Sequence, residues 1–308
     1  MIKENKIHTL IEMAKGLQEK PHSTKDLRNA VSLYYRAYQM TGDDYPLLKA
    51  RTQVGMASAL QLIPDKNSGL LLQAKISYEE VLPILQQLAA KEEVAEAKMN
   101  LGLVLQSLAP FNLARITDSI QAYQEALQVF TWEHYPQQYA ILQNNIANAY
   151  LSKPMTREQQ YAQQGLAIQT FEAALQHINS IDHPREYAML QSNLGNAWQY
   201  VPTNNLRDNL LRAIAAYDRA LKVRNYQDTS LEYANTIANK ANALFNLPDD
   251  LAKPDMGNPQ NLKKARYYYQ QAWKIFNTYK QVKQAEIVAQ AIREVEHKVI
   301  SSEPSFTS

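Results

Sequence analysis

A segment of about 46 residues recurs along this chain of 308 residues, and a period of that length is typical of stacked-repeat proteins. The clearest copies read YAILQNNIANAY (139–150), YAMLQSNLGNAW (187–198) and YANTIANKANAL (233–244). In such proteins each unit buries its apolar face against its neighbours, so the fold grows by addition and does not close into a globule. The repeat therefore predicts one elongated, continuous architecture.

A second motif lies between these copies and has the spacing of one helix face. A small residue stands four positions before an aromatic residue, and another small or β-branched residue stands three positions after it. This spacing places all three side chains on one side of an α-helix. The aromatic residues are Tyr34, Tyr78, Tyr123, Phe171, Tyr217 and Tyr269. The pattern predicts six helices that bury this face.

The first motif also has a recurrent small residue, at Gly16, Gly55, Gly102, Ala147, Gly195 and Ala241, where we expect two helices to touch. A proline follows each of these positions, at Pro21, Pro64, Pro110, Pro154, Pro202 and Pro248. Because proline lacks the backbone N–H and clashes inside a helix, the six prolines are predicted to mark six helix ends.

Together the two motifs predict an all-α protein of six antiparallel helix pairs and a closing helix. The expected pairs are 3–19 with 26–40, 47–63 with 70–88, 92–108 with 115–131, 136–152 with 161–179, 185–200 with 207–224, and 231–246 with 261–277, and the closing helix is 281–299. We expect a single domain over residues 1–300, a long loop over 247–261 and a disordered tail over 301–308.

This arrangement resembles the tetratricopeptide repeat (TPR), in a long-repeat form similar to kinesin light chain and to bacterial multi-repeat proteins. The likeness rests on pairs such as Gly195 with Trp198 on a first helix and the series Ala213, Tyr217, Ala220 on a second helix. It implies a right-handed α-solenoid in which the first helices line a concave groove. It also implies a role in binding proteins, with groove asparagines holding the backbone of a ligand.

Composition excludes several other functions. The net charge of +2 is too small to argue for nucleic acid or an anionic membrane, and the absence of cysteine excludes disulfides and thiol catalysis. No apolar run approaches the roughly 18 residues needed to span a bilayer, and no signal peptide is recognised, so a cytoplasmic location is expected. The histidine spacings do not suit a metal, and Asp249, Asp250 and Asp255 suit helix capping better than calcium. We expect no cofactor, no metal and no enzymatic activity.

Asparagines form two columns on the predicted first helices. Asn100, Asn145, Asn193 and Asn239 lie two residues before the small packing residue, Asn148, Asn196 and Asn242 lie one residue after it, and Asn144 shares a helix face with Asn148. Because asparagine is a mediocre helix former, its repetition suggests a compensating benefit. The amides either bridge neighbouring repeats or pair with the backbone of an extended peptide in the groove. Lys240, where the preceding repeats have Ile146 and Leu194, either snorkels outward or supplies one positive charge to that groove.

These observations predict a non-catalytic scaffold or adaptor that holds a segment of a partner protein or a peptide in an asparagine-lined groove. An assembly factor or chaperone for a larger complex and a peptide-responsive regulatory sensor are the two alternatives. Neither the identity of the partner nor the oligomeric state follows from the sequence.

Overall fold

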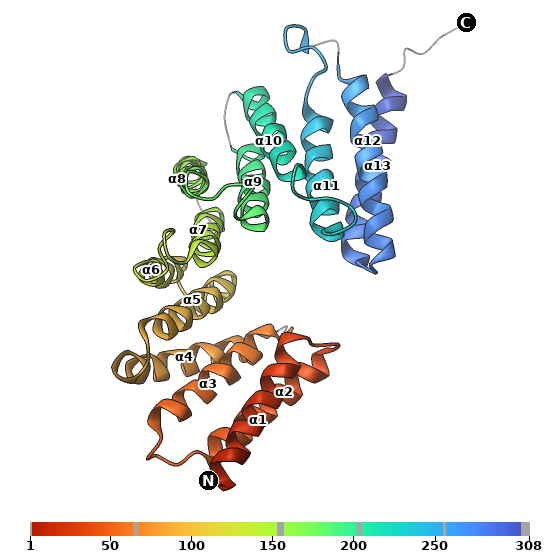
Figure 1. The fold of residues 1–308 in the computed structure, drawn as a ribbon. Helices are drawn as coiled ribbons and strands as arrows, with labels where there is room; N and C mark the ends of the chain where they lie inside the picture. Colours follow the sequence, from red (N-terminus) through yellow and green to blue (C-terminus); the bar gives the residue numbers. More distant parts are fainter. Residues whose placement is uncertain (1, 65–66, 153–156, 202–204, 255–256, 303–308) are drawn as a thin grey trace, which may run out of the picture. The chain divides into compact units, whose positions relative to one another are not determined.

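In the computed structural model, residues 2–64, 67–152, 157–201, 205–254 and 257–302 are described, and in these residues the only regular secondary structure is helical (Figure 1). The helices are α1 (Ile2–Glu19), α2 (Thr24–Met40), α3 (Pro46–Leu62), α4 (Gly69–Leu88), α5 (Lys91–Leu108), the 3₁₀ turn η1 (Ala109–Phe111), α6 (Ile116–Leu127), α7 (Pro136–Leu151), α8 (Arg157–Leu175), α9 (Pro184–Gln199), α10 (Leu206–Leu221), α11 (Ser230–Asn246), α12 (Pro259–Thr278) and α13 (Val282–Ser302). The predicted all-α helical-repeat fold is confirmed.

The chain forms two compact units, residues 1–153 and 154–308. In the first unit α1 packs on α2, α3 on α4 and α5 on α6, and each second helix also packs on the next first helix, so that α7 follows α6. In the second unit α8 packs on α9, α9 on α10 and α11 on α12, and α13 packs on α12. The single domain over 1–300 and the handedness of the solenoid stay predictions.

Prolines mark both ends of these helices. Pro21, Pro64 and Pro248 lie just beyond the last residues of α1, α3 and α11, and Pro110 lies in the 3₁₀ turn that follows α5. Pro154 and Pro202 fall outside the described residues. Four further prolines, which the sequence analysis did not use, occupy the first helical position: Pro46, Pro136, Pro184 and Pro259. That position suits proline because its N–H has no partner within the helix.

Three second helices end three to four residues earlier than predicted, at Leu127, Leu175 and Leu221 instead of 131, 179 and 224. Tight turns replace the last helical turn, as where the N–H of Val223 donates to the carbonyl of Ala220. In the loops that follow, an asparagine side chain accepts hydrogen bonds from backbone N–H groups and stabilises a turn. The Oδ1 atom of Asn225 accepts from the backbone N–H groups of Gln227 and Asp228, and Asn179 does the same for the two residues before His183. Such side-chain turns compete with helix continuation.

The aromatic motif forms the core, as predicted. All six aromatic side chains and the small residues that flank them are buried. Each large ring removes about 150–250 Å² of surface from water, which makes this series the main apolar contribution of the repeat. The rings of Tyr78, Tyr123, Phe171 and Tyr217 are among the largest fully buried side chains.

Two predicted packing positions are wrong. Gly16 is exposed on α1, and a Cβ atom added there would meet nothing within 4 Å. The buried residue that packs with Tyr34 is Ala14. In the second pair Ala57 packs with Tyr78, while Gly55 contacts the Tyr34 ring of the preceding pair. The corrected series is Ala14, Ala57, Gly102, Ala147, Gly195 and Ala241. In both pairs a glycine was predicted as the packing residue, whereas the residue that packs against the tyrosine of the pair is the alanine two positions away from it.

In the long loop before α12, Asp249 caps a helix as predicted, whereas Asp250 accepts from the backbone N–H of Ala252 within the loop. The carboxylate of Asp249 accepts from the backbone N–H groups of Gln260 and Asn261 in the first turn of α12, where anions are favoured. Asp255 falls outside the described residues. The closing helix α13 is present and includes residues 301 and 302, which the sequence analysis assigned to the tail, and residues 303–308 fall outside the described residues.

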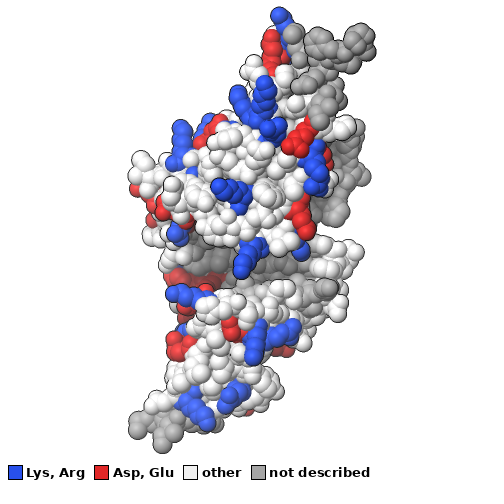
Figure 2. Space-filling view, turned by 90° about the vertical axis from the view of Figure 1, so that its right-hand side faces the viewer, with Lys and Arg blue, Asp and Glu red and all other residues white. Residues whose placement is uncertain are grey.

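The surface carries both signs of charge. On the face in Figure 2, Lys and Arg side chains lie among Asp and Glu side chains and are separated by uncharged surface, in agreement with the small net charge. Among the described residues, no helix is both long enough and apolar enough to cross a membrane.

We expect Gly195→Ala to destabilise the protein, because its Cβ atom would lie 2.5 Å from Cε1 of Tyr217. Overpacking of this kind costs about 1–3 kcal/mol. Gly165→Ala on α8 is the matched control, since its Cβ atom would meet nothing within 4 Å. Alanine favours a helix over glycine by about 0.5–1 kcal/mol, so the control is expected to stabilise. Urea unfolding followed by circular dichroism measures both, and equal changes in the two variants would contradict the packing described here.

Candidate functional site

The first helices of successive pairs meet on one side of each unit. In the first unit α1 contacts α3, α3 contacts α5 and α5 contacts α7, and in the second unit α9 contacts α11 (Figure 1). We call this side the inner face of a unit. Within the units, α2, α4, α6, α10 and α12 each pack between two neighbouring helices of the other series. Side chains that point away from these second helices therefore lie on the inner face.

The two asparagine columns lie on this face once the packing positions are corrected. The first column, two residues before the packing residue, is Glu12, Gly55, Asn100, Asn145, Asn193 and Asn239. The second column, one residue after it, is Lys15, Ser58, Leu103, Asn148, Asn196 and Asn242. Asparagine therefore occupies the first column from the third pair onward and the second column from the fourth pair onward. The earlier positions have charged, small, hydroxyl or apolar residues.

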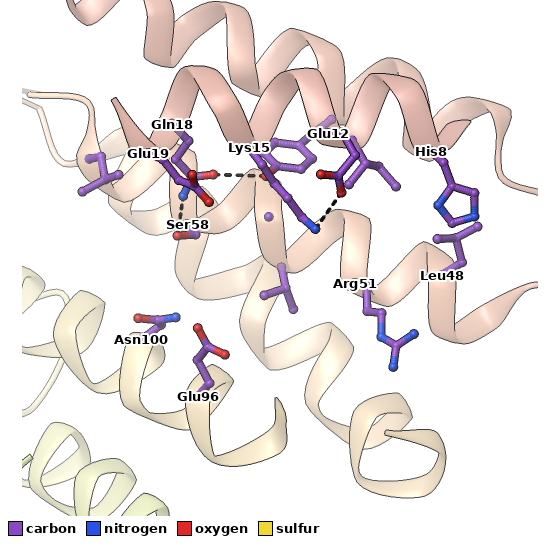
Figure 3. A pocket seen from close by; sticks show the side chains of 15 residues that line it. His8, Glu12, Lys15, Gln18, Glu19, Leu48, Arg51, Ser58, Glu96 and Asn100 are labelled. Atoms are coloured by element: carbon purple, nitrogen blue, oxygen red, sulfur yellow. Dashed lines mark hydrogen bonds and ion pairs between the residues drawn. The ribbon is translucent and has the colours of Figure 1, made fainter. Parts of the chain in front are cut away.

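A groove crosses the inner face of the first unit. Its cavity of about 550 Å³ is lined from α1, α3 and α5, and five of its lining residues are column positions: Glu12, Lys15, Gly55, Ser58 and Asn100. We call it the unit-1 groove. Figure 3 shows Glu12, Lys15 and Glu19 pointing from α1 toward this space, with Glu96 and Asn100 entering it from α5. Apolar side chains also line it, among them Leu48, Val54 and Leu62, and Leu62 is 48% exposed.

Both cations of the unit-1 groove are already paired. The Nζ atom of Lys15 lies 2.9 Å from Oε1 of Glu12. The Arg51 guanidinium donates two hydrogen bonds of 2.7 Å to the Glu93 carboxylate, which joins α3 to α5. These hydrogen bonds lower the pKa of Glu93 and raise that of Arg51. The groove therefore presents no unpaired Lys or Arg side chain from its lining residues.

A polar relay connects the buried Tyr34 to the groove. Its hydroxyl donates to Oε1 of Gln18 at 3.2 Å, and Nε2 of Gln18 donates to Oγ of Ser58 at 2.7 Å. The relay links the first pair to the second pair. Burial raises the pKa of Tyr34 to about 12, and the charges of Glu12 and Glu19 add to the effect. A neutral phenol is thus favoured in the fold, and its contribution to stability declines as the pH rises above about 10.

The second unit has an equivalent cavity of about 350 Å³ on its inner face, the unit-2 groove. It is lined by Tyr200 at the end of α9, Asn239 and Asn242 on α11, Tyr269 on α12, and residues of α13 that include Gln290 and Glu294. Two predicted site residues therefore lie in a groove. Glu294 accepts a hydrogen bond of 3.0 Å from Gln290, and the lining contains no Lys or Arg.

Asparagines bridge neighbouring pairs in this unit. The Oδ1 atom of Asn196 accepts from the Tyr217 hydroxyl at 2.7 Å and from Nδ2 of Asn239 at 2.9 Å, which joins α9, α10 and α11. One pair further along, Nδ2 of Asn242 donates to the Tyr200 hydroxyl at 3.1 Å. These contacts match the bridging interpretation of the columns. They leave Nδ2 of Asn196 and Oδ1 of Asn242 without a hydrogen bond to a described residue.

Three predicted site asparagines lie on α7, the last helix of the first unit. Asn144 is buried and donates to Oδ1 of Asn145 at a long 3.5 Å. The buried Nδ2 atom of Asn145 has no partner among the described residues. The half-buried Asn148 side chain makes no hydrogen bond to them either. Asn193, on α9, is half-buried and has a polar partner.

Lys240 follows neither of its two predicted alternatives. Its Nζ atom lies 2.6 Å from Oδ1 of Asp218 and 4.9 Å from the ring centroid of Tyr268, and its side chain is only 13% exposed. Burial lowers the pKa of Lys240, but the hydrogen bond and charge of Asp218 outweigh it, so that the pKa is raised. The ammonium is paired on the side of α10 and α12 and does not line the unit-2 groove.

Three of the buried tyrosines donate to glutamines that were not predicted as partners from the sequence. Tyr123 donates to Oε1 of Gln106 at 2.8 Å and Tyr217 to Oε1 of Gln199 at 2.9 Å, as Tyr34 does to Gln18. Each glutamine lies four residues after the packing residue, so these glutamines were visible as a recurrent residue of fixed spacing.

Among the described residues, no group of three or more His, Cys, Asp or Glu side chains is placed to hold a metal ion. The grooves instead offer amides, carboxylates, a hydroxyl and apolar side chains. This combination suits the recognition of a polypeptide, whose backbone has donors and acceptors and whose side chains alternate in character.

Comparisons with known proteins do not assign a family or a function to the chain. No protein-family model and no curated protein matches the chain. Among solved structures, BtubC (BKLC) from P. vanneervenii is 19% identical, with a TM-score of 0.46 over 73% of this chain and 91% of that one. A Rap protein in complex with Competence and Sporulation Factor is 13% identical, with a TM-score of 0.34 over 98% of both chains. Because both scores are below 0.5, we draw no functional argument from them. Membership of the tetratricopeptide family stays a prediction.

We expect alanine substitutions in the second column to lower stability where the asparagine bridges two pairs and to leave it unchanged where it does not. Asn196→Ala removes the acceptor of two hydrogen bonds and is expected to destabilise the protein by about 1–3 kcal/mol, despite a gain in helix propensity of up to about 0.7 kcal/mol. Asn148→Ala is the control and is expected to leave stability unchanged or slightly higher. Thermal unfolding of both variants provides the measurement, and a loss at Asn148 as large as that at Asn196 would refute the difference.

Proposed function

We propose that this chain is a non-catalytic protein-interaction scaffold that binds an extended segment of a partner protein on its inner faces. The observation that carries the proposal is the unit-1 groove, an open cavity of about 550 Å³ that runs over three successive first helices. A ligand segment lying across it would contact α1, α3 and α5 together. Binding would therefore use several repeats and not one.

The chemistry of the groove supports a polypeptide ligand. Asn100 lines it with an amide that makes no hydrogen bond to a described residue, so both its donor and its acceptor are available to a ligand backbone. Leu62 and Val54 offer an apolar surface for a side chain of the segment. The unit-2 groove repeats this plan, with Asn239 and Asn242 beside the partly exposed apolar side chain of Ile287.

We expect Asn100→Trp to abolish capture of the partner by filling the unit-1 groove. The Asn100 side chain makes no hydrogen bond to a described residue, so its replacement breaks none of those in the described structure. Gln121→Trp is the matched control, because Gln121 is exposed on the second helix α6, behind the inner face. Circular dichroism melting establishes that both variants are folded.

The measurement is affinity capture from an extract of the native source, with bound proteins identified by mass spectrometry for the wild type and both variants. We expect a set of proteins that the wild type and Gln121→Trp retain and that Asn100→Trp loses by about tenfold or more, a loss of about 1.4 kcal/mol or more in binding free energy. Identical retention by all three proteins would show that the partner does not use this groove.

A further inference from the structure

The unit-1 groove contains two carboxylates that no cation neutralises. Glu19 on α1 and Glu96 on α5 both line it, and neither makes an ion pair or hydrogen bond with a described residue. Figure 3 shows the two side chains entering the groove from opposite walls. The Lys and Arg side chains that line the groove, Lys15 and Arg51, already pair with Glu12 and Glu93. The groove therefore has an excess of negative charge within its own lining.

The carboxylates of the groove also affect the pKa values of buried tyrosines. After burial, the charges of Glu12 and Glu19 are the causes that raise the pKa of Tyr34. Burial likewise raises the pKa of Tyr78, and the charge of Glu96 acts in the same sense. The charges of Glu19 and Glu96 thus each raise the pKa of a buried tyrosine beneath the inner face.

The surroundings of the carboxylates determine which cation they suit. Two carboxylates alone are a poor set for a metal ion, and no metal-binding group is present among the described residues. A lysine or arginine side chain is a better match, because its aliphatic stem can pack on Leu62 and Val54 while its cation lies near the carboxylates. An acidic segment would have to displace Glu12 from Lys15 or Glu93 from Arg51 to find a partner.

We infer that the unit-1 groove recognises a segment of a partner protein that carries a lysine or arginine, with its cation paired with Glu19 or Glu96. This inference rests on the proposed function, since it names the chemistry of the segment that the groove holds. The amide of Asn100 on α5 and the hydroxyl of Ser58 on α3 line the same groove and can pair with the backbone beside that side chain. Recognition is thereby divided between a general backbone contact and one specific charge.

The probe for the test is a library of random twelve-residue peptides displayed on phage. It is panned against the full-length wild type, against Glu19→Gln/Glu96→Gln and against Glu172→Gln/Glu286→Gln. The last variant changes the net charge by the same amount at two exposed positions outside both grooves. Asn100→Trp serves as the protein with a filled groove.

We expect the wild type and the Glu172/Glu286 control to enrich peptides rich in Lys or Arg, and Glu19→Gln/Glu96→Gln to lose that preference. The affinity of one enriched peptide, synthesised with a fluorophore and measured by anisotropy, should fall by about three- to thirtyfold in Glu19→Gln/Glu96→Gln, as expected for two partly exposed ion pairs. The same loss is expected when its Lys or Arg is replaced by alanine.

Two other outcomes overturn the inference in different ways. Enrichment of peptides without a basic residue, or binding of basic peptides that is unchanged in Glu19→Gln/Glu96→Gln, would refute the recognition of a cation and leave the groove as a peptide site. A wild type that enriches no peptide beyond those of Asn100→Trp would refute both the inference and the proposed function.

Discussion

Within each unit, the contact between an aromatic ring on a second helix and a small residue on its paired first helix determines how closely the two helices can approach. At Gly102 and Gly195 the tyrosine ring occupies the place that a Cβ atom would need, with ring atoms 2.5 Å from that position. The other packing residues are alanines, which allow a slightly wider approach. Within a unit, each second helix also packs on the next first helix, so the distance between the helices of one pair affects where the next pair lies.

A buried tyrosine brings a hydroxyl into the core, and that hydroxyl requires a partner. Gln18, Gln106 and Gln199 meet this requirement from the first helix, and Asn196 adds a second acceptor for Tyr217. The fourth pair has Phe171 as its aromatic residue, and the residue four positions after its packing residue is Leu151. The glutamine is also absent at the sixth pair, where Phe245 stands four residues after Ala241 although the aromatic residue is Tyr269. In the second pair Gln61 is present, but neither its Oε1 atom nor the Tyr78 hydroxyl has a hydrogen-bond partner among the described residues. The glutamine contact is therefore a feature of three pairs.

Periodicity made the helices, the buried aromatic face and the pairing predictable, because each depends on a spacing that recurs several times along the sequence. The packing positions of the first two pairs were not predictable from residue size alone. Gly16 and Ala14 are both small, and the neighbours of each residue distinguish them. The ends of the second helices were also not predictable from the repeat, because they depend on turns made by side chains such as Asn225. The asparagine columns were visible in the sequence, but their hydrogen bonds to Tyr217 and Tyr200 needed the structure.

The bridges between pairs differ from one junction to the next, and this limits how the chain can evolve by recombination. At one junction Gln18 reaches Ser58, and at another Asn196 receives Asn239. A pair transplanted to another position would present the wrong partner: the second pair placed after the fifth would offer Gly55 where Asn196 meets an amide. Exchange of single repeats is therefore expected to cost a hydrogen bond at such a junction, even though the repeats share one backbone plan.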